Sequence, residues 1–62
     1  MKSAEIFRHG IDWYVEYYND GVHMKHCGEF FSGFNENPLK DAIKMAKNFW
    51  GCKSICIIFE KE

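Results

Sequence analysis

The sequence predicts one compact α+β domain over residues 1–62: a small antiparallel sheet with one helix packed on one face, in the order β-β-β-α-β. Three observations indicate this fold class. Alternating aromatic and polar residues flank an Asp-Gly pair, which is typical of a hairpin. A later segment repeats apolar residues at helical spacing. A short run rich in β-branched residues follows that segment and predicts a last strand.

Three strands are predicted in the N-terminal half of the chain. The segment AEIFRH forms the first, and HG then offers a turn. The second is IDWYVEYY, whose aromatic and β-branched residues favour a strand. Asp20 and Gly21 follow as a hairpin turn, because glycine tolerates the positive φ that such turns require. The third strand is VHMKHC, Gly28 either ends it or admits a bulge, and EFFSGF continues it irregularly.

The helix is predicted over residues 37–50. Asn37 can cap it, Pro38 suits the first helical position, and Gly51 supplies a stop. One side carries an apolar stripe made of Leu39, Ala42, Ile43, Ala46, Phe49 and Trp50. Another side carries the lysines Lys40, Lys44 and Lys47. The segment KSICIIFEK then returns the chain to the sheet as the last strand.

A two-residue turn at Asp20-Gly21 divides the hairpin into two faces, because side chains alternate along a strand. The more apolar face, which we expect the helix to cover, carries Trp13, Val15, Tyr17, Val22 and Met24. The other face carries Tyr14, Glu16, Tyr18, His23, Lys25 and Cys27, with Glu16 opposite Lys25. The last strand adds Cys56 and Ile58 to that second face. We expect Leu39, Ile43, Ala46 and Phe49 to be buried against Trp13, Val15, Tyr17 and Ile57.

Charge and cysteine content restrict the function classes. A formal net charge of −1 disfavours a protein that mainly neutralises a phosphate backbone. No apolar run approaches the roughly 18 residues of a membrane span, and the N-terminus lacks the apolar centre of a secretory signal. Three cysteines are an odd number, so we expect reduced thiols in a cytoplasmic protein.

Metal binding and catalysis find little support in the spacing of the residues. The candidate zinc ligands are His23, His26, Cys27, Cys52 and Cys56, but their spacing lacks the tight pairs of good zinc sites. Cys56 is better read as a small buried hydrophobic residue. His23 and Cys27 lie about 13 Å apart along one strand, too far for a nucleophile and its base. We therefore expect no metal, no cofactor and no enzyme activity.

The face away from the predicted helix is the candidate functional surface. Eleven aromatic residues in 62 are more than a one-helix core needs, and aromatic residues are enriched at the centres of protein interfaces. The contact residues predicted there are Tyr14, Glu16, Tyr18, His23, Lys25 and Ile58, and the expected partner is another protein or a second copy of the chain. One alternative is a single-stranded nucleic-acid binder with Tyr14 and Tyr18 as stacking platforms and Lys25 on phosphate. Strand propensity alone could also place tyrosines at these positions.

The hairpin WYVEYYNDG followed by NPLKDAIKMAKNF resembles HicB-type antitoxins and other small ββαβ domains. The shared features are an aromatic strand, a DG turn and an Ala-spaced helix, and they cover about half the chain. GEFFSGFNEN stands where that family has a proline-rich link. The resemblance implies an inhibitor or antitoxin-like role. A short, aromatic-rich chain is also similar in type to bacteriophage accessory proteins, many of which bind and block one host factor, and an adaptor is a third form of such a role.

Overall fold

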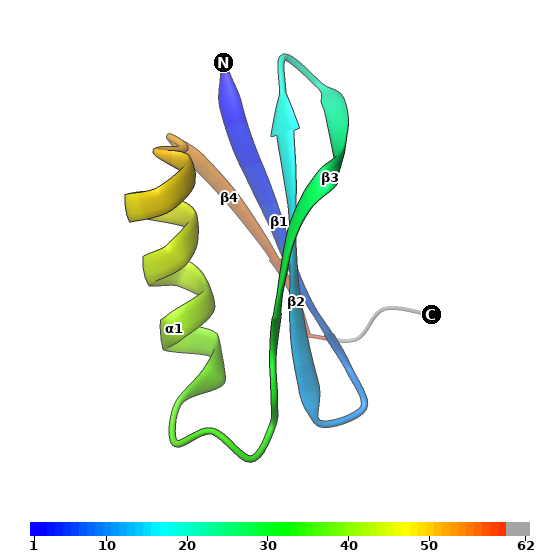
Figure 1. The fold of residues 1–62 in the computed structure, drawn as a ribbon, viewed down its shortest axis with the longest axis vertical. Helices are drawn as coiled ribbons and strands as arrows, with labels where there is room; N and C mark the ends of the chain where they lie inside the picture. Colours follow the sequence, from blue (N-terminus) through cyan, green and yellow to red (C-terminus); the bar gives the residue numbers. More distant parts are fainter. Residues whose placement is uncertain (60–62) are drawn as a thin grey trace.

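The computed structural model describes residues 1–59 as a four-stranded sheet with a helical segment on one side (Figure 1). The elements in chain order are β1 (Lys2–His9), β2 (Asp12–Asn19), β3 (Val22–Phe31), α1 (Pro38–Met45), the π-helical turn η1 (Ala46–Trp50) and β4 (Ser54–Ile58). The predicted α+β order β-β-β-α-β is confirmed. Within the described residues, the second face of the sheet has no helix on it.

Strand order across the sheet is β3-β2-β1-β4. β1, β2 and β3 form an antiparallel meander, as predicted, whereas β4 pairs with β1 in parallel. The parallel pair departs from the purely antiparallel sheet expected from the sequence. The parallel pair follows from the helical crossover. The helical segment α1–η1 returns the chain from the end of β3 to the edge of the sheet where β3 starts, and β4 therefore runs in the same direction as β1 and β3.

The β2–β3 turn forms as its sequence predicts. Asp20 and Gly21 have φ values of 53° and 81°, so both central residues are in the left-handed region that a type I′ turn requires. The turn fixes the first two cross-strand pairs, Asn19 with Val22 and Tyr18 with His23. Both pairs agree with the predicted register.

Beyond these pairs the predicted register is wrong. The stretch from Met24 to Cys27 bulges opposite Tyr17, so that Glu16 pairs with Gly28 instead of Lys25. The offset is three residues, an odd number, and it therefore exchanges the faces of the following side chains. Cys27 was predicted on the outer face, but it packs against the core. In the predicted register His26 would have paired with Val15, whereas in the structure Val15 pairs with Glu29.

The helical segment begins as predicted and ends differently. The side-chain oxygen of Asn37 accepts a hydrogen bond from the backbone N–H of Lys40 at 3.3 Å, and Gly51 ends the segment at φ 69°. The last turn is π-helical, with i→i+5 hydrogen bonding. An α-helix advancing about 100° per residue would turn Phe49 toward the sheet. The wider π turn rotates less per residue, so Phe49 is 63% exposed and Trp50 packs against the core instead.

The core lies between the helical segment and the sheet. It consists of Ala4, Ile6, Trp13, Val15, Tyr17, Ala42 and Ala46, and the partly buried residues around it include Leu39, Ile43, Trp50, Cys52 and Ile55. The Trp50 indole stacks on Tyr17 with 5.3 Å between ring centroids. Its Nε1–H donates to the backbone oxygens of Ser3 and Tyr18, each at 3.1 Å. Trp50 thereby ties the end of the helical segment to β1 and β2.

Three further burial predictions are wrong. Val22, expected on the face that the helix covers, is 64% exposed beside the Asp20-Gly21 turn. Ile57 is 38% exposed and Cys56 is exposed. Ile57 is exposed because β4 is an edge strand that has few contacts with the helical segment. Cys56 is exposed because it pairs with Glu5 and points to the side of the sheet away from the helix. Ile55 takes the core position on this strand.

Candidate functional site

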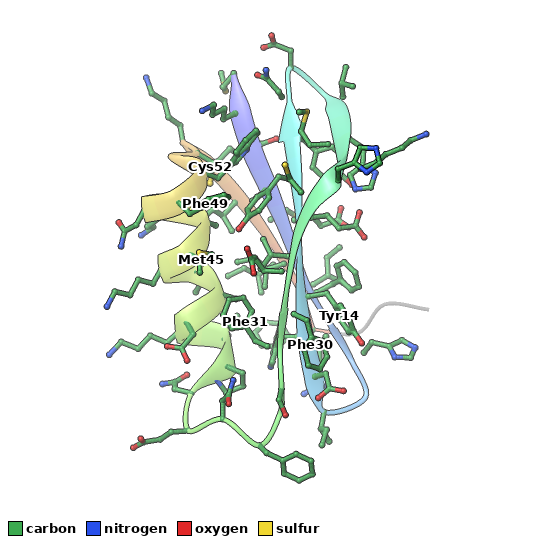
Figure 2. All side chains as sticks on the ribbon, viewed as in Figure 1. Tyr14, Phe30, Phe31, Met45, Phe49 and Cys52 are labelled. Atoms are coloured by element: carbon green, nitrogen blue, oxygen red, sulfur yellow. The ribbon has the colours of Figure 1, made fainter. Side chains whose placement is uncertain are left out.

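The sheet surface that faces away from α1 is called the open face below, and its dominant feature is an apolar row across all four strands. Cross-strand pairing places Phe30 beside Tyr14, Tyr14 beside Phe7, and Phe7 beside Ile58. The rings of Phe7 and Tyr14 stack with centroids 5.5 Å apart, and Tyr14 meets Phe30 edge-on at 5.2 Å. Figure 2 shows Tyr14 and Phe30 projecting from the side of the sheet opposite the helix.

A polar row lies next to the apolar one. It is made of Gly28, Glu16, Glu5 and Cys56, one from each strand. Glu16 is held by two neighbours from the following row: the Tyr18 hydroxyl and the His23 Nε2 each lie 3.2 Å from its Oε2. The Tyr18 and His23 rings are 5.1 Å apart. These contacts fix the orientation of Glu16 on the sheet.

Where β3 bulges, the open face is hollowed. The hollow measures about 380 Å³, and its lining combines rings with polar side chains: Phe7, Tyr14, Val15, Glu16, His23, Lys25, Gly28, Glu29 and Phe30. Gly28 has no side chain to fill the space, and a β-carbon there would lie 3.3 Å from the Val15 carbonyl oxygen. Phe30 stands beside the hollow and is 55% exposed.

The structure brings the predicted contact residues onto one surface. Tyr14, Glu16, Tyr18 and His23 occupy the open face, Lys25 lines the hollow, and Ile58 ends the apolar row. Sequence reasoning missed Phe7, Phe30 and Glu5. The alternation of AEIFRH already separates Phe7 and Glu5 from Ala4 and Ile6, but placing them beside Tyr14 and Glu16 requires the pairing of β1 with β2.

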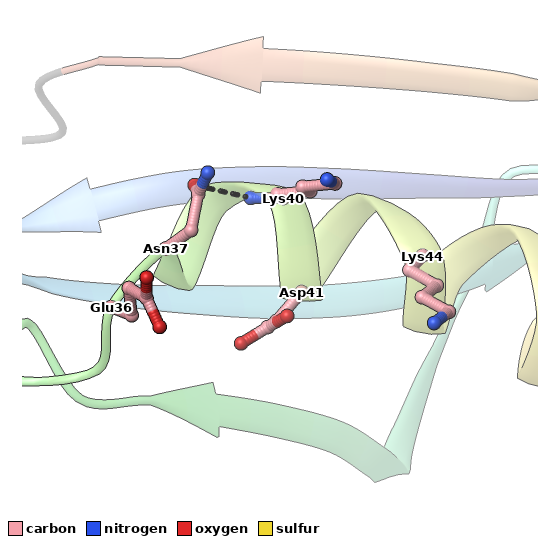
Figure 3. Close-up of a pocket in the computed structure, with 5 residues that line it drawn as sticks. All are labelled: Glu36, Asn37, Lys40, Asp41 and Lys44. Atoms are coloured by element: carbon pink, nitrogen blue, oxygen red, sulfur yellow. Dashed lines mark hydrogen bonds between the residues drawn. The ribbon is translucent and has the colours of Figure 1, made fainter.

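Two other hollows lie on the helix side. The first surrounds the start of α1, measures about 580 Å³, and is lined by Glu36, Asn37, Lys40, Asp41 and Lys44 (Figure 3). Its side chains are exposed and of mixed charge, and Asn37 is already engaged in capping the helix. The second, of about 440 Å³, runs between β3 and α1 past Phe31 and Met45. Both are rimmed by charged and amide side chains, unlike the apolar row.

Tyr17, Cys27 and Cys52 are titratable residues that belong to the core or pack against it. Burial raises the pKa of Tyr17 to about 12, and the negative charges of Glu29, Cys52 and Cys27 add to the shift. All three cysteines are free thiols; Cys52 donates to the Ala46 carbonyl oxygen at 3.4 Å. Among residues 1–59, no three His, Cys, Asp or Glu side chains are grouped closely enough to hold a metal ion. Over the same residues, no helix has the length and apolar character needed to cross a membrane.

No protein-family model matches the chain, and no curated protein or solved structure matches it significantly. The resemblance to HicB-type antitoxins therefore rests on the quoted residues alone. A functional proposal for this protein has to be argued from the geometry of its own surfaces, and the open face carries an apolar row that no helix of residues 1–59 covers.

Proposed function

We propose that this protein is a small non-catalytic protein-binding module whose contact surface is the open face. The observation that carries the proposal is the apolar row of Phe30, Tyr14, Phe7 and Ile58, which spans the sheet on the side without a helix. Phe30 is exposed, and Phe7, Tyr14 and Ile58 are half-buried. Apolar side chains that remain accessible to water as a group mark interaction sites, because burying them against a partner removes apolar surface from water. The partner is another protein or a second copy of the chain.

The row is well suited to act as a set of anchors. Its residues stand on strands, and the rings contact one another, so little side-chain freedom remains to be lost on binding. Aromatic residues at the centre of an interface are worth about 2 kcal/mol or more each. The polar residues Glu16 and His23 form a partly hydrated border that can give orientation and specificity.

Inhibitor, antitoxin-like protein and adaptor are the forms of this function that we consider, including a phage-type accessory protein that blocks a host factor. All of them require binding without chemistry, which an aromatic surface can supply. We also propose a cytoplasmic location, because three free thiols suit a reducing compartment.

Single-stranded nucleic acid is the alternative ligand, since the rings of Phe7, Tyr14 and Phe30 could receive bases. Two features oppose it. Glu5 and Glu16 occupy the row next to the rings, where a nucleic acid would carry its phosphates, and the net charge of the chain is −1. Tyr18, the second stacking residue of this alternative, already contacts His23 and Glu16. Titration of a labelled oligonucleotide at two salt concentrations separates the alternatives, because phosphate binding weakens steeply with salt.

The test of the proposal is a comparison of three baits in a lysate of the organism that encodes the chain. The baits are the wild type, a Tyr14→Ser, Phe30→Ser variant of the open face, and a Phe34→Ser, Phe49→Ser control on other surfaces. Phe34 and Phe49 are 89% and 63% exposed, so the control removes at least as much exposed ring. We expect the wild type and the control to retain the same protein and the open-face variant to lose it. Equal retention by all three baits would contradict the proposal.

A further inference from the structure

We infer that the outer edge of β3, over residues 28–31, binds an extended peptide of another protein, which adds a strand to the sheet and directs one apolar and one basic side chain to the helix side. This site is separate from the open face, so it goes beyond the proposed function. Three properties lead to it: outward backbone groups on β3, a groove between β3 and α1, and a half-buried carboxylate on the same side of the strand.

The outer edge of β3 has backbone groups that no strand of residues 1–59 pairs with, because β3 ends the sheet order β3-β2-β1-β4. The N–H and C=O groups of an antiparallel strand alternate between facing the partner strand and facing away from it. The two-residue turn makes Asn19 and its partner a hydrogen-bonded pair, and steps of two along β2 give the same role to Val15. Glu29, the partner of Val15, therefore bonds to β2, whereas the backbone groups of Gly28 and Phe30 face outward.

Only the second half of this edge is regular. The bulge between His23 and Gly28 distorts the first half, and Lys25 lies there; both features discourage strand addition. From Gly28 to Phe31 the pairing with β2 continues without interruption. The accessible edge is therefore short, so backbone hydrogen bonds alone would hold a peptide weakly and side-chain contacts have to add to them.

A groove of about 440 Å³ runs along the helix side of this edge. Its apolar members are Phe31 from β3 and Met45 from α1, and both are half-buried. Figure 2 shows Phe31 directed from β3 toward α1, and Figure 3 shows Asp41 and Lys44 on the flank of α1 that is turned toward β3. Side chains alternate across a strand, so the residue of an added peptide that lies opposite Phe31 would direct its side chain to the groove. An apolar residue fits that position.

The Glu29 carboxylate defines a second position. Pairing with Val15 places Glu29 on the helix side, and its negative charge adds to the raised pKa of the buried Tyr17. Glu29 is half-buried, and no cation among residues 1–59 forms an ion pair with it. A basic side chain of the peptide opposite Glu29 would supply a complementary charge. Because Glu29 and Phe31 are two residues apart on β3, the peptide should carry its basic and apolar residues two positions apart.

Selection from a phage-displayed library of random peptides of strand length, with the wild-type chain as the target, tests the inference. We expect the enriched peptides to share an apolar and a basic residue two positions apart. In the complex with one such synthetic peptide, hydrogen exchange at the Gly28 and Phe30 amides should slow roughly tenfold or more, because strand addition gives their N–H groups acceptors. Failure to enrich any peptide, or unchanged exchange at both amides, would overturn the inference. Protection by peptides without the expected pattern would overturn the role assigned to Glu29 and the groove.

Two comparisons separate the backbone contact from the side-chain contact, with affinity measured by titration of the selected peptide. Phe30→Pro removes the outward N–H and leaves the bonds to β2 in place, as proline at an edge strand can. It should bind roughly tenfold more weakly than Phe30→Ser, which loses the same ring but keeps the N–H. Glu29→Gln should weaken binding of the basic peptide roughly tenfold, but not of the same peptide with glutamine in place of its basic residue. Circular dichroism checks that each variant is folded.

Equal affinities of Phe30→Pro and Phe30→Ser would show that the peptide does not extend the sheet, and the inference would be wrong. If Phe30→Pro does not fold, exchange at the two amides of the wild type decides the question instead. The proposal for the open face would stand in either case, because the bait comparison tests side chains on the other side of the sheet.

Discussion

Removing the hydroxyl of Tyr17 should stabilise this protein, although most substitutions of core residues destabilise. Tyr17 is fully buried at 0% exposure, and among the described residues its hydroxyl has no hydrogen-bond partner. An unpaired buried hydroxyl costs about 1–3 kcal/mol. Tyr17→Phe removes that cost and keeps the ring stacked on Trp50, while the small space left by the oxygen offsets part of the gain. We expect the free energy of unfolding to rise by about 1 kcal/mol at neutral pH.

The advantage of the variant should grow at high pH. Burial raises the pKa of Tyr17 from 10.0 to about 12, so between these values the unfolded chain loses the phenolic proton while the folded chain keeps it. Wild-type stability from this group is therefore fully present below pH 10 and is lost as the pH rises toward 12. A shift of about two pH units corresponds to about 2.7 kcal/mol. Tyr17→Phe has no such proton to lose.

Urea denaturation of the wild type and Tyr17→Phe near pH 7 and near pH 11 measures both effects. The matched control is Tyr14→Phe on the open face, where the tyrosine is only half-buried. It should change stability by no more than about 0.5 kcal/mol. A Tyr17→Phe variant that is less stable than the wild type at pH 7 would refute the reasoning, because the hydroxyl would then have a partner. So would a stability difference that is the same at both pH values.

Three further changes test the fold, each by urea denaturation. Trp50→Phe should cost about 1–3 kcal/mol, because it removes the donor to two backbone carbonyls, whereas Phe49→Leu at the neighbouring exposed position should stay within about 0.5 kcal/mol. Equal losses of unfolding free energy in the two variants would show that Phe49 contributes to the core as much as Trp50 does. Asn37→Ala should cost about 1 kcal/mol through the lost helix cap, and no loss would remove that role. Gly33→Ala should cost about 1–3 kcal/mol, because a β-carbon there would overlap the Ile11 backbone; a neutral effect would mean that this loop yields freely.

Local chemistry predicted the turns and the ends of the helix. Asp20-Gly21 supplies two residues that tolerate positive φ, and Asn37-Pro38 supplies a cap and a fixed φ, so each outcome depends on only a few neighbouring residues. Gly51 ends the helical segment for the same kind of reason. These parts of the fold could be predicted because no distant contact has to be known.

The size of the bulge and the π turn could not be predicted, because both depend on packing between distant segments. Gly28 allows a bulge, but nothing in VHMKHC specifies a shift of three residues between His23 and Gly28. Similarly, Phe49 and Trp50 are neighbours of similar hydrophobicity, and both rings lie beside Tyr17. Only the hydrogen bonds from the Trp50 indole to the backbone carbonyls of β1 and β2 select Trp50 for the core. Tertiary contacts, which the periodicity of the sequence does not reveal, thus determine the register of β3 and the choice of Trp50 over Phe49.

The candidate site was predictable in kind and incomplete in membership. Alternation along β2 placed Tyr14, Glu16 and Tyr18 on the face away from the helix in any register that kept Tyr17 inside. Phe30 came to this face only through the bulge, which reverses the faces of the residues after it. The ring that projects most from the apolar row was therefore the one that the sequence could not place.

The most direct test of the central claim, that the open face is a contact surface, is the accessibility of two phenylalanine rings. A soluble paramagnetic agent relaxes exposed ring protons, and isotope-labelled phenylalanine lets Phe30 and Phe49 be compared in one molecule. The dilute chain should show both rings exposed, as in the structure. At high concentration, or in a lysate of the organism that encodes the chain, Phe30 should become protected while Phe49 stays accessible. Rings that remain equally accessible under all three conditions would contradict the claim.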